Sequence, residues 1–135
     1  MDCIFCKITT GEIPSYSVFE NESSIAFLDI HPFVKGHTLV IPRIHSRWIW
    51  DSDENEYIEL MKSVKQVASQ LKKAFHTDWI QVVVAGKEVH HTHVHLLPRV
   101  ENDGYPEIPV QPMKQPNEGE MKVIQKKIIF ETCKL

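Results

Sequence analysis

The longest regular pattern of apolar residues predicts one amphipathic helix in the middle of the chain. From Asp53, with Glu56 three residues later as a capping partner, apolar residues recur at the three- and four-residue spacing of one helix face. They are Tyr57, Leu60, Met61, Val64, Val67, Ala68, Leu71 and Phe75. This spacing predicts a helix of about six turns, with its apolar face packed against the rest of the protein.

Five runs rich in β-forming residues flank this helix. They predict strands over residues 17–20, 25–30, 37–41, 79–85 and 90–97. Asn21-Glu22-Ser23 has the turn chemistry of a hairpin between the first two, and Gly86-Lys87 predicts a tight connection between the last two. A short helical turn over residues 4–10, ended by Gly11, precedes the strands.

The order of these elements predicts the fold class. A short helix, three strands, a long helix and two strands lack β-α-β alternation, which favours an α+β fold with an antiparallel five-stranded sheet. Beyond Arg99, glycine and prolines mark an irregular segment before a last amphipathic helix over about residues 118–131. At 135 residues and 42% hydrophobic content, we expect one domain, with its core in residues 1–100 and a tail in 101–135.

Charge and hydropathy exclude some partners. The formal net charge is −3, and no cluster of lysine and arginine with interleaved aromatic residues is present, so polymeric nucleic acid is not an expected partner. No apolar run reaches the roughly eighteen residues that would cross a bilayer, and the first seven residues lack a signal-peptide core. We therefore expect no membrane association and a cytoplasmic location.

Three cysteines are too few and too unevenly spaced for a disulfide framework. Cys3 and Cys6 form a C-x-x-C pair, which is either half of a metal site or a redox couple. A redox pair belongs after a strand in a β-α-β unit, which this chain lacks. Cys133 stands alone and is expected to be an inert thiol.

His91, His93 and His95 alternate along a predicted strand, so we expect their side chains on one face of the sheet. A neutral imidazole can attack phosphorus at neutral pH, and a second one on the same face can donate a proton to the leaving group. Three imidazoles in a row also suit a zinc site, and the pattern alone leaves both interpretations open. We expect His90 to be structural and His76 to be a solvated helix end.

Five motifs in order resemble the histidine triad family. They are CIFCKI at residues 3–8, GEIPS at 11–15, AFLDI at 26–30, GHTLVIP at 36–42 and HTHVHLLPR at 91–99. The tail beyond Arg99 carries no matching motif. The resemblance implies a HIT-like fold and an enzyme that hydrolyses or transfers purine nucleotides, similar to a purine nucleoside phosphoramidase.

The resemblance also implies a mechanism. His93 would attack the α-phosphorus of a nucleoside 5′-phosphoramidate or a dinucleoside polyphosphate, giving a nucleotidyl-histidine intermediate that water resolves. His95 would contact the phosphoryl oxygens and assist the leaving group. His37 would support this catalytic face from a neighbouring strand, although it could also be a simple strand-edge residue.

A nucleoside pocket follows from the same motifs. Asp29 would accept hydrogen bonds from the ribose hydroxyls. The apolar residues that match the family's base pocket are Ile4, Phe5, Ile8, Phe27, Leu28, Ile30 and Leu39. Core packing is an equal alternative for several of them, whereas Phe5 and Phe27 offer the flat walls that a base needs.

The zinc-carrying members of the family imply a closed, structural metal site. Its four ligands here would be Cys3, Cys6, His45 and His91. This assignment leaves His93 and His95 for chemistry. The family also typically pairs two chains edge to edge into one sheet, so we expect a homodimer.

The loop before the triad departs from the family pattern. Many members have a longer loop with an Asn-Gly and a Gln aimed at the phosphate, but this chain reads VAGKEV at residues 84–89. Gly86 remains as a residue whose backbone could approach substrate, and Lys87 could be a phosphate contact or a solvated hairpin residue. The alternative function is therefore a nucleotide-binding or sensing protein with weak catalysis.

Overall fold

A five-stranded antiparallel sheet forms the centre of the computed structural model, which describes residues 2–133 and the side chains of residues 2–130. The side chain of Cys133 therefore lies outside the described part. The strands are β1 (Ser17–Glu20), β2 (Ser24–Leu28), β3 (Thr38–Pro42), β4 (Trp79–Val83) and β5 (Val94–Arg99). They lie in the order β1-β2-β3-β5-β4, with every neighbouring pair antiparallel. The expected α+β class and sheet are confirmed.

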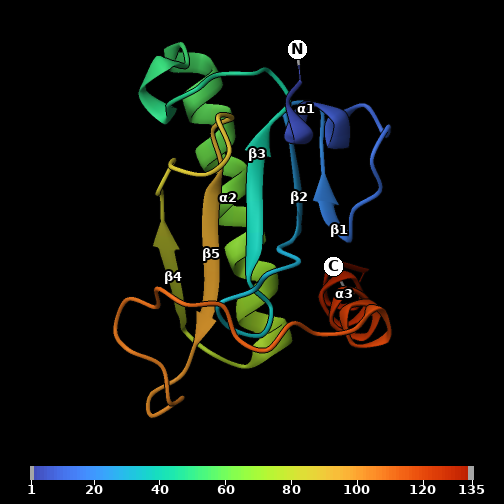
Figure 1. The fold of residues 1–135 in the computed structure, drawn as a ribbon, viewed down its shortest axis with the longest axis vertical. Coiled ribbons are helices and arrows are strands. Elements are labelled where there is room, and N and C mark those ends of the chain that lie inside the picture. Colours follow the sequence, from blue (N-terminus) through green and yellow to red (C-terminus); the bar gives the residue numbers. More distant parts are fainter. Residues whose placement is uncertain (1, 134–135) are drawn as a thin grey trace.

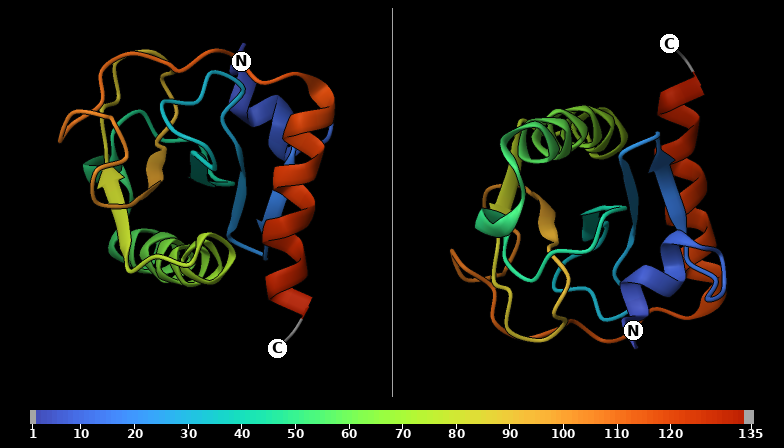
Figure 2. Two further views of the ribbon diagram at one scale, coloured as in Figure 1. Left: turned by 90° about the horizontal axis from the view of Figure 1, so that it is seen from below. Right: turned by 90° about the horizontal axis from the view of Figure 1, so that it is seen from above.

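Helices lie on both faces of the sheet. The elements are α1 (Ile4–Thr9), the 3-10 turn η1 (Ile49–Asp51), α2 (Glu54–Phe75) and α3 (Glu118–Cys133). The long helix α2 crosses one face, α3 lies beside β1, and α1 lies near the opposite face (Figures 1 and 2). In the described part of the chain, no helix combines the length and apolar character that a membrane span requires.

Alternation along β2 and β3 sends side chains into two separate apolar clusters. Ala26, Leu28 and Val40 pack with α2 and α3 in the larger cluster. Phe27 and Leu39 pack with α1 in the smaller one. Because both strands are covered on both faces, all five residues of each are buried.

Individual capping and glycine residues determine where the long helix begins and ends and how the loop beside it turns. The side chain of Asp53 accepts a hydrogen bond from the Glu56 amide at 2.8 Å, which caps α2 as expected. The helix ends at Phe75, and the next residue, His76, caps it, is exposed and adopts φ 52°. Gly36 has φ 87°, and a Cβ there would lie 2.5 Å from the Phe75 ring, so glycine is required where this loop meets the end of α2.

The connection between β4 and β5 is longer than predicted. β5 begins at Val94, so residues 84–93 form a loop and the prediction of a tight turn at Gly86-Lys87 is wrong. The cause is a contact between distant segments, because the Thr92 amide donates to the Ser46 carbonyl at 2.7 Å instead of pairing with β4. His90 is exposed in this loop, so the expectation that it is structural is also wrong.

A buried arginine holds the irregular tail against the end of the sheet. The Arg99 side chain is 1% exposed and donates from Nε and one terminal nitrogen to both carboxylate oxygens of Asp103, at 2.7 and 3.0 Å. It also donates to the carbonyls of Pro106 and Glu107. These hydrogen bonds order a segment that has neither helix nor strand.

Candidate active site

Three of the predicted site histidines come together on the face of the sheet that α1 approaches. The register pairs Phe27 of β2 with Leu39 of β3, and Leu39 with His95 of β5, so these residues form one row on that face. His37 directly precedes β3, and its ring centroid lies 5.1 Å from that of His95. His93 directly precedes β5, with its ring centroid 4.9 Å from that of His95.

A backbone hydrogen bond fixes the orientation of the His93 ring. Nδ1 of His93 lies 2.7 Å from the His91 carbonyl oxygen. Because a carbonyl can only accept, Nδ1 carries the proton and Nε2 carries the lone pair. Burial lowers the pKa of His93; the His91 hydrogen bond and Asp29 raise it, and Arg47 lowers it further. The result is a neutral imidazole whose free nitrogen is set by the backbone.

A second chain of hydrogen bonds fixes His95 in the opposite tautomer. The Phe33 amide donates to Nδ1 of His37 at 3.0 Å, so Nε2 of His37 carries the proton. That nitrogen lies 2.9 Å from Nδ1 of His95 and donates to it. His95 therefore carries its own proton on Nε2. Burial, followed by His37 and His93, lowers the pKa of His95 to about 4, which keeps it a neutral donor near pH 7.

Asp29 stands at the edge of this group, in the loop after β2. Its side chain is 20% exposed. One carboxylate oxygen accepts from the His31 amide at 2.8 Å, and the other lies 3.6 Å from Nε2 of His37. Asp29 also opposes the burial that lowers the pKa of His37. An oxygen near solvent and beside the histidines has the reach to contact a polar ligand.

A flat apolar wall adjoins the His93 ring. Phe5 of α1 packs edge-to-face on His93, with 5.1 Å between ring centroids, and on Phe27 at 5.5 Å. Leu39 belongs to the same cluster, and Ile8 packs against it. These four predicted pocket residues therefore lie together beside the histidines.

The remaining predicted pocket residues lie elsewhere. Ile4 and Ile30 are 48% and 52% exposed and do not belong to the buried cluster. Leu28 packs on the opposite face with α2 and α3, so its assignment to the pocket is wrong. Adjacent strand residues point to opposite faces, and Phe27 and Leu28 therefore could not both line one pocket.

Four metal-ligand atoms converge next to the histidines. They belong to Cys3 and Cys6, one helical turn apart at the start of α1, to His45 in the loop after β3, and to His91. Sγ of Cys3 lies 3.5 Å from Nδ1 of His91, and Sγ of Cys6 lies 3.3 Å from Nδ1 of His45. The two Nδ1 atoms are 3.2 Å apart.

These distances fit a tetrahedral zinc ion. Zinc–sulfur and zinc–nitrogen bond lengths place neighbouring ligand atoms about 3.3–3.8 Å apart. Nε2 of His91 lies 2.8 Å from the Pro42 carbonyl and donates to it, which turns the Nδ1 lone pair toward the cysteines. The donor set and this supporting hydrogen bond therefore fit a metal ion such as zinc. His91 thus faces the cysteines and does not join His93 and His95 in a three-histidine site.

Comparison with known proteins now identifies the family. The model of the HIT domain family matches residues 10–102, more than half of the chain. The chain belongs to the HIT domain family. An adenosine 5′-monophosphoramidase of Saccharomyces cerevisiae is 39% identical over 72% of this chain and 62% of its own length. An adenylylsulfatase of Arabidopsis thaliana is 32% identical over 76% of this chain and 54% of its own.

Solved structures of HIT proteins have the same fold. A hypothetical histidine triad nucleotide-binding protein from Sulfolobus tokodaii superposes with a TM-score of 0.86 at 35% identity, covering 98% of this chain and 93% of that one. A zinc-bound histidine triad family protein from Mycobacterium smegmatis has a TM-score of 0.77 at 27% identity, covering 100% and 99%.

Two residues of this HIT protein that the sequence did not predict, Arg47 and Trp48, contact the loop before the triad. Arg47 donates to the carbonyl of Gly86, and its guanidinium lies 3.6 Å above the ring of Trp48. Gly86 has φ 76°, and a Cβ there would lie 2.8 Å from the Trp48 ring. Arg47 belongs to none of the family motifs. Only its place two residues after His45, a predicted metal ligand, could have indicated that it lies near the site.

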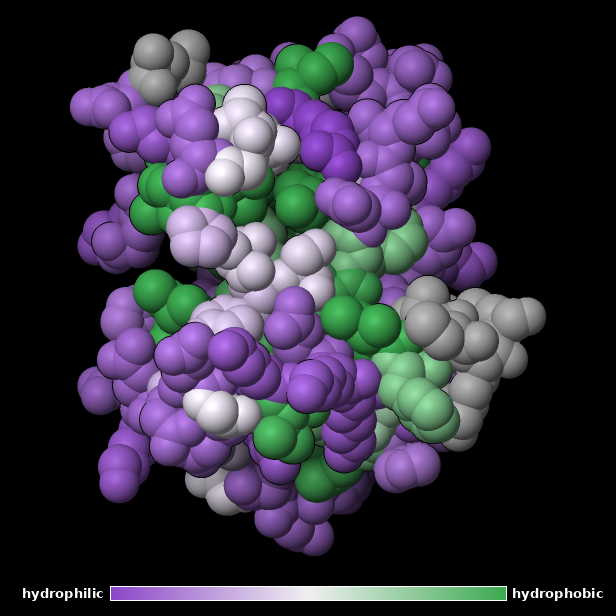
Figure 3. Space-filling model, turned by 90° about the vertical axis from the view of Figure 1, so that its right-hand side faces the viewer, coloured by the Kyte–Doolittle hydropathy of each residue, from purple (hydrophilic) through white to green (hydrophobic). Residues whose placement is uncertain are grey.

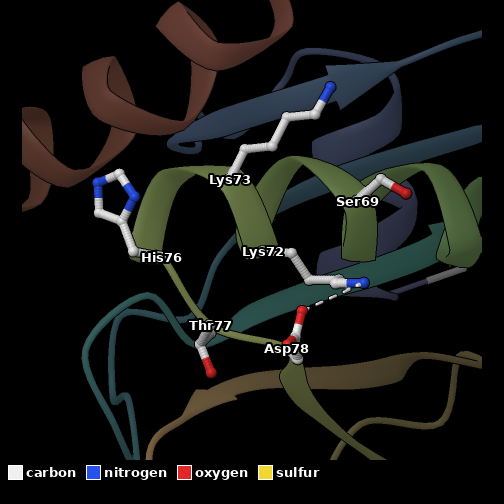
Figure 4. Close-up of a pocket in the computed structure, with 6 residues that line it drawn as sticks. All are labelled: Ser69, Lys72, Lys73, His76, Thr77 and Asp78. Carbon is white, nitrogen blue, oxygen red and sulfur yellow. Dashed lines mark ion pairs between the residues drawn. The ribbon is translucent and has the colours of Figure 1, made fainter.

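A surface depression of about 450 Å³ lies away from the histidines described above, at the end of α2 (Figure 4). It is lined by Ser69, Lys72, Lys73, His76, Thr77 and Asp78. Lys72 and Asp78 form an ion pair across it at 3.9 Å, and both side chains are largely exposed. The depression holds no buried polar group, so we do not place the functional site there.

Proposed function

We propose that this HIT protein hydrolyses nucleotides at the α-phosphorus through a covalent nucleotidyl intermediate on His93. The observation that carries this proposal is the opposite tautomers of two neighbouring imidazoles. His93 presents a lone pair on Nε2, whereas His95 presents a proton on Nε2. A nucleophile beside a neutral donor is the arrangement that displacement at phosphorus requires.

In the first step, Nε2 of His93 would form a bond to the α-phosphorus as the bond to the leaving group breaks. The N–H on Nε2 of His95 would hydrogen-bond to the phosphoryl oxygens and the leaving group, and the leaving group would take its proton from solvent. In the second step, water would attack phosphorus and release His93. The proton lost by the water would pass to solvent, His93 would regain the lone pair on Nε2, and a nucleoside 5′-monophosphate would leave.

The nucleoside would lie toward α1 and β2. Phe5, Phe27 and Leu39 form an apolar wall beside His93, with Ile8 behind it. Asp29 would accept from the ribose hydroxyls through the carboxylate oxygen that faces His37. Ile4 and Ile30 are exposed and would form at most the rim of this pocket.

Nucleoside 5′-phosphoramidates and dinucleoside polyphosphates are the proposed substrates. The yeast relative's phosphoramidase activity and the plant relative's adenylylsulfatase activity support chemistry at the same phosphorus. The shortened loop supports a second candidate, a nucleotide-binding or sensing protein with weak catalysis, because Gly86 is followed by an exposed lysine and glutamate rather than an uncharged phosphate cradle.

Zinc would have a structural role. Cys3, Cys6, His45 and His91 would fill all four positions, so the ion would fasten α1 to the sheet and would not activate water. The zinc-bound mycobacterial relative supports this assignment. Because α1 also carries Phe5, the ligands would hold one wall of the nucleoside pocket in place.

A homodimer through β4 is also proposed. β4 is an edge strand, and Trp79 and Val82 on it are 39% and 49% exposed. The other edge is less available, because α3 packs beside β1 and hydrophilic residues cover most of that side, with hydrophobic residues in smaller groups (Figure 3). An exposed apolar edge strand favours pairing with a second copy. Light scattering at micromolar concentration should give a dimer mass; a monomer mass would contradict this.

The function is tested with adenosine 5′-phosphoramidate as substrate. The wild type should release adenosine 5′-monophosphate, and His93→Ala should lose at least about a thousandfold in kcat. Rapid denaturation during turnover should trap a nucleotidyl adduct on His93. Equal turnover by both proteins would remove His93 from its role. Tight monophosphate binding without turnover would favour the binding or sensing protein.

A further inference from the structure

Arg47 is a half-buried cation whose hydrogen-bonding capacity is mostly unused. One of its N–H groups donates to the Gly86 carbonyl. A guanidinium has five N–H donors. Within the described part of the chain, none of the others has a protein acceptor, and no carboxylate forms an ion pair with Arg47. Arg99, the more deeply buried arginine, has its donors taken by Asp103, Gln81 and backbone carbonyls.

The side chain of Arg47 is nevertheless held in place. Its guanidinium stacks 3.6 Å above the Trp48 ring, and that ring lies so close to Gly86 that a Cβ on Gly86 would be 2.8 Å from it. Stacking and a hydrogen bond reduce the conformational freedom that an arginine would lose on binding a ligand. An ordered guanidinium with free donors is prepared to bind an anion of fixed geometry, because such donors prefer charged oxygen acceptors.

The position of Arg47 in the fold indicates which part of a bound nucleotide it would contact. Its partner Gly86 lies in the loop that leaves β4, whereas the apolar wall lies over β2 and β3 together with α1. The sheet order places β5, which His93 directly precedes, between these two regions. A nucleotide with its base on the apolar wall and its phosphorus at His93 would extend its leaving group toward the loop and Arg47.

We propose that Arg47 binds an anionic leaving group, so that this protein prefers nucleotides whose leaving group carries a further phosphate or a sulfate over those that release a neutral amine. This proposal rests on the function proposed above. It makes Arg47 a specificity-determining residue, with Trp48 and Gly86 as its positioning residues. A cationic contact would also take the place of the uncharged loop residues that this chain lacks.

Competing substrates test the proposal. Values of kcat/KM are measured with adenosine 5′-phosphosulfate and with adenosine 5′-phosphoramidate. Arg47→Gln should lower the value for the sulfate substrate about 10- to 100-fold, the size expected for loss of a charge-assisted hydrogen bond. The value for the phosphoramidate should change less than about threefold. Arg47→Lys should keep part of the preference, because it keeps the charge but not the fork of donors.

Arg43→Gln is the matched control. Arg43 pairs with Glu20 and the Asn21 carbonyl at the surface, so its loss should leave both values unchanged. Equal losses for both substrates in Arg47→Gln would mean a general structural role and would overturn the proposal. Unchanged values for both would overturn it as well.

A binding experiment separates this proposal from the proposed function. In the His93→Ala background, calorimetry compares adenosine 5′-diphosphate with adenosine 5′-monophosphate. Arg47→Gln should weaken binding of the diphosphate about tenfold or more and binding of the monophosphate much less. This result would support Arg47 even if the wild type shows no turnover. Equal weakening, or none, would overturn the proposal whether or not the protein is an enzyme.

Discussion

His37 donates from Nε2 to Nδ1 of His95 across 2.9 Å, and the Phe33 amide fixes the direction of that donation from the other side of the His37 ring. A backbone N–H thereby decides which nitrogen of His95 carries a proton. The tautomer of His93 is decided in the same way by a backbone carbonyl. Two side chains of the same type thus receive opposite roles from the main chain around them.

Replacing His37 should therefore damage catalysis without much effect on substrate binding. His37→Phe fills the space but cannot donate, so His95 is free to place its proton on Nδ1. We expect kcat to fall at least about tenfold with KM little changed, because hydrogen-bond donation by His95 to the phosphoryl oxygens is impaired. His37→Gln, whose amide can donate, should restore part of the activity.

The direct measurement is nitrogen NMR of the His95 ring in the wild type and in His37→Phe. The wild type should show a proton on Nε2, and the variant should show a mixture of tautomers. His76→Phe, at the exposed end of α2, is the control and should change neither kcat nor the spectrum of His95. An unchanged tautomer together with unchanged kcat in His37→Phe would contradict the proposed positioning.

Removing the metal should affect both stability and the nucleoside pocket. We expect one zinc per chain, and its loss in a Cys3→Ser, Cys6→Ser double variant, because α1 supplies two of the four ligands. The midpoint of thermal unfolding should fall by more than about 10 °C. Phe5 would lose its anchorage beside His93, so affinity for adenosine 5′-monophosphate should also weaken.

Metal analysis and calorimetry check this outcome, with Cys133→Ser as the control that should keep the zinc. Zinc retained after loss of both Cys3 and Cys6 would point instead to a site made by His91, His93 and His95. Loss of zinc with unchanged nucleotide affinity would show that α1 does not depend on the metal for its position.

Alanine should cost more stability at Gly86 than at Gly104, because only Gly86 has a side chain packed close to it. Both have positive φ, 76° and 87° respectively, so alanine strains the backbone at either position. At Gly104 the new Cβ would meet nothing within 4 Å, whereas at Gly86 it would lie 2.8 Å from Trp48. We expect Gly104→Ala to cost about 1 kcal/mol and Gly86→Ala about 1–3 kcal/mol more.

Chemical denaturation measures both free energies, and the activity of folded Gly86→Ala reports on Arg47. Displacement of Trp48 should lower kcat/KM for the sulfate substrate more than for the phosphoramidate. Equal unfolding free energies for the two variants would show that Trp48 moves aside without cost.

The parts of the fold predictable from sequence are those that depend on local patterns. The helix that Asp53 caps follows from residue spacing within a few turns, and β1 follows from its β-forming residues and the turn after it. The start of β5 was missed because it depends on Thr92 bonding to Ser46, a contact across 46 positions of the chain. No local pattern contains that information.

The site residues also divide into those that motifs predict and those that depend on contacts between distant positions. The approach of Cys3, Cys6, His45 and His91 to one point follows from motifs that the family resemblance supplies. The assignment of Leu28 to the pocket was avoidable, because alternation along β2 points its side chain to the face opposite that of Phe27. Arg47 was not predictable, because its relevance comes from a hydrogen bond to a loop 39 positions away and from stacking on its own neighbour.

The contact between Arg99 and Asp103 should make stability depend on pH at the acid end. The hydrogen bonds from Arg99 lower the pKa of Asp103 to about 2, from an ordinary value of 3.8. A carboxylate with a lowered pKa in the folded state contributes stability that is fully present above about pH 4 and is lost as the pH falls toward 2.

Asp103→Asn removes the charge at every pH and leaves the buried guanidinium without its carboxylate, which should cost about 3 kcal/mol at pH 7. Glu20→Gln, which breaks the exposed pair with Arg43, should cost less than about 0.5 kcal/mol. Urea unfolding at pH 7 and pH 3 measures both, and the difference between wild type and Asp103→Asn should shrink at the lower pH. A difference that stays constant with pH would show that the Asp103 carboxylate is not what holds the tail.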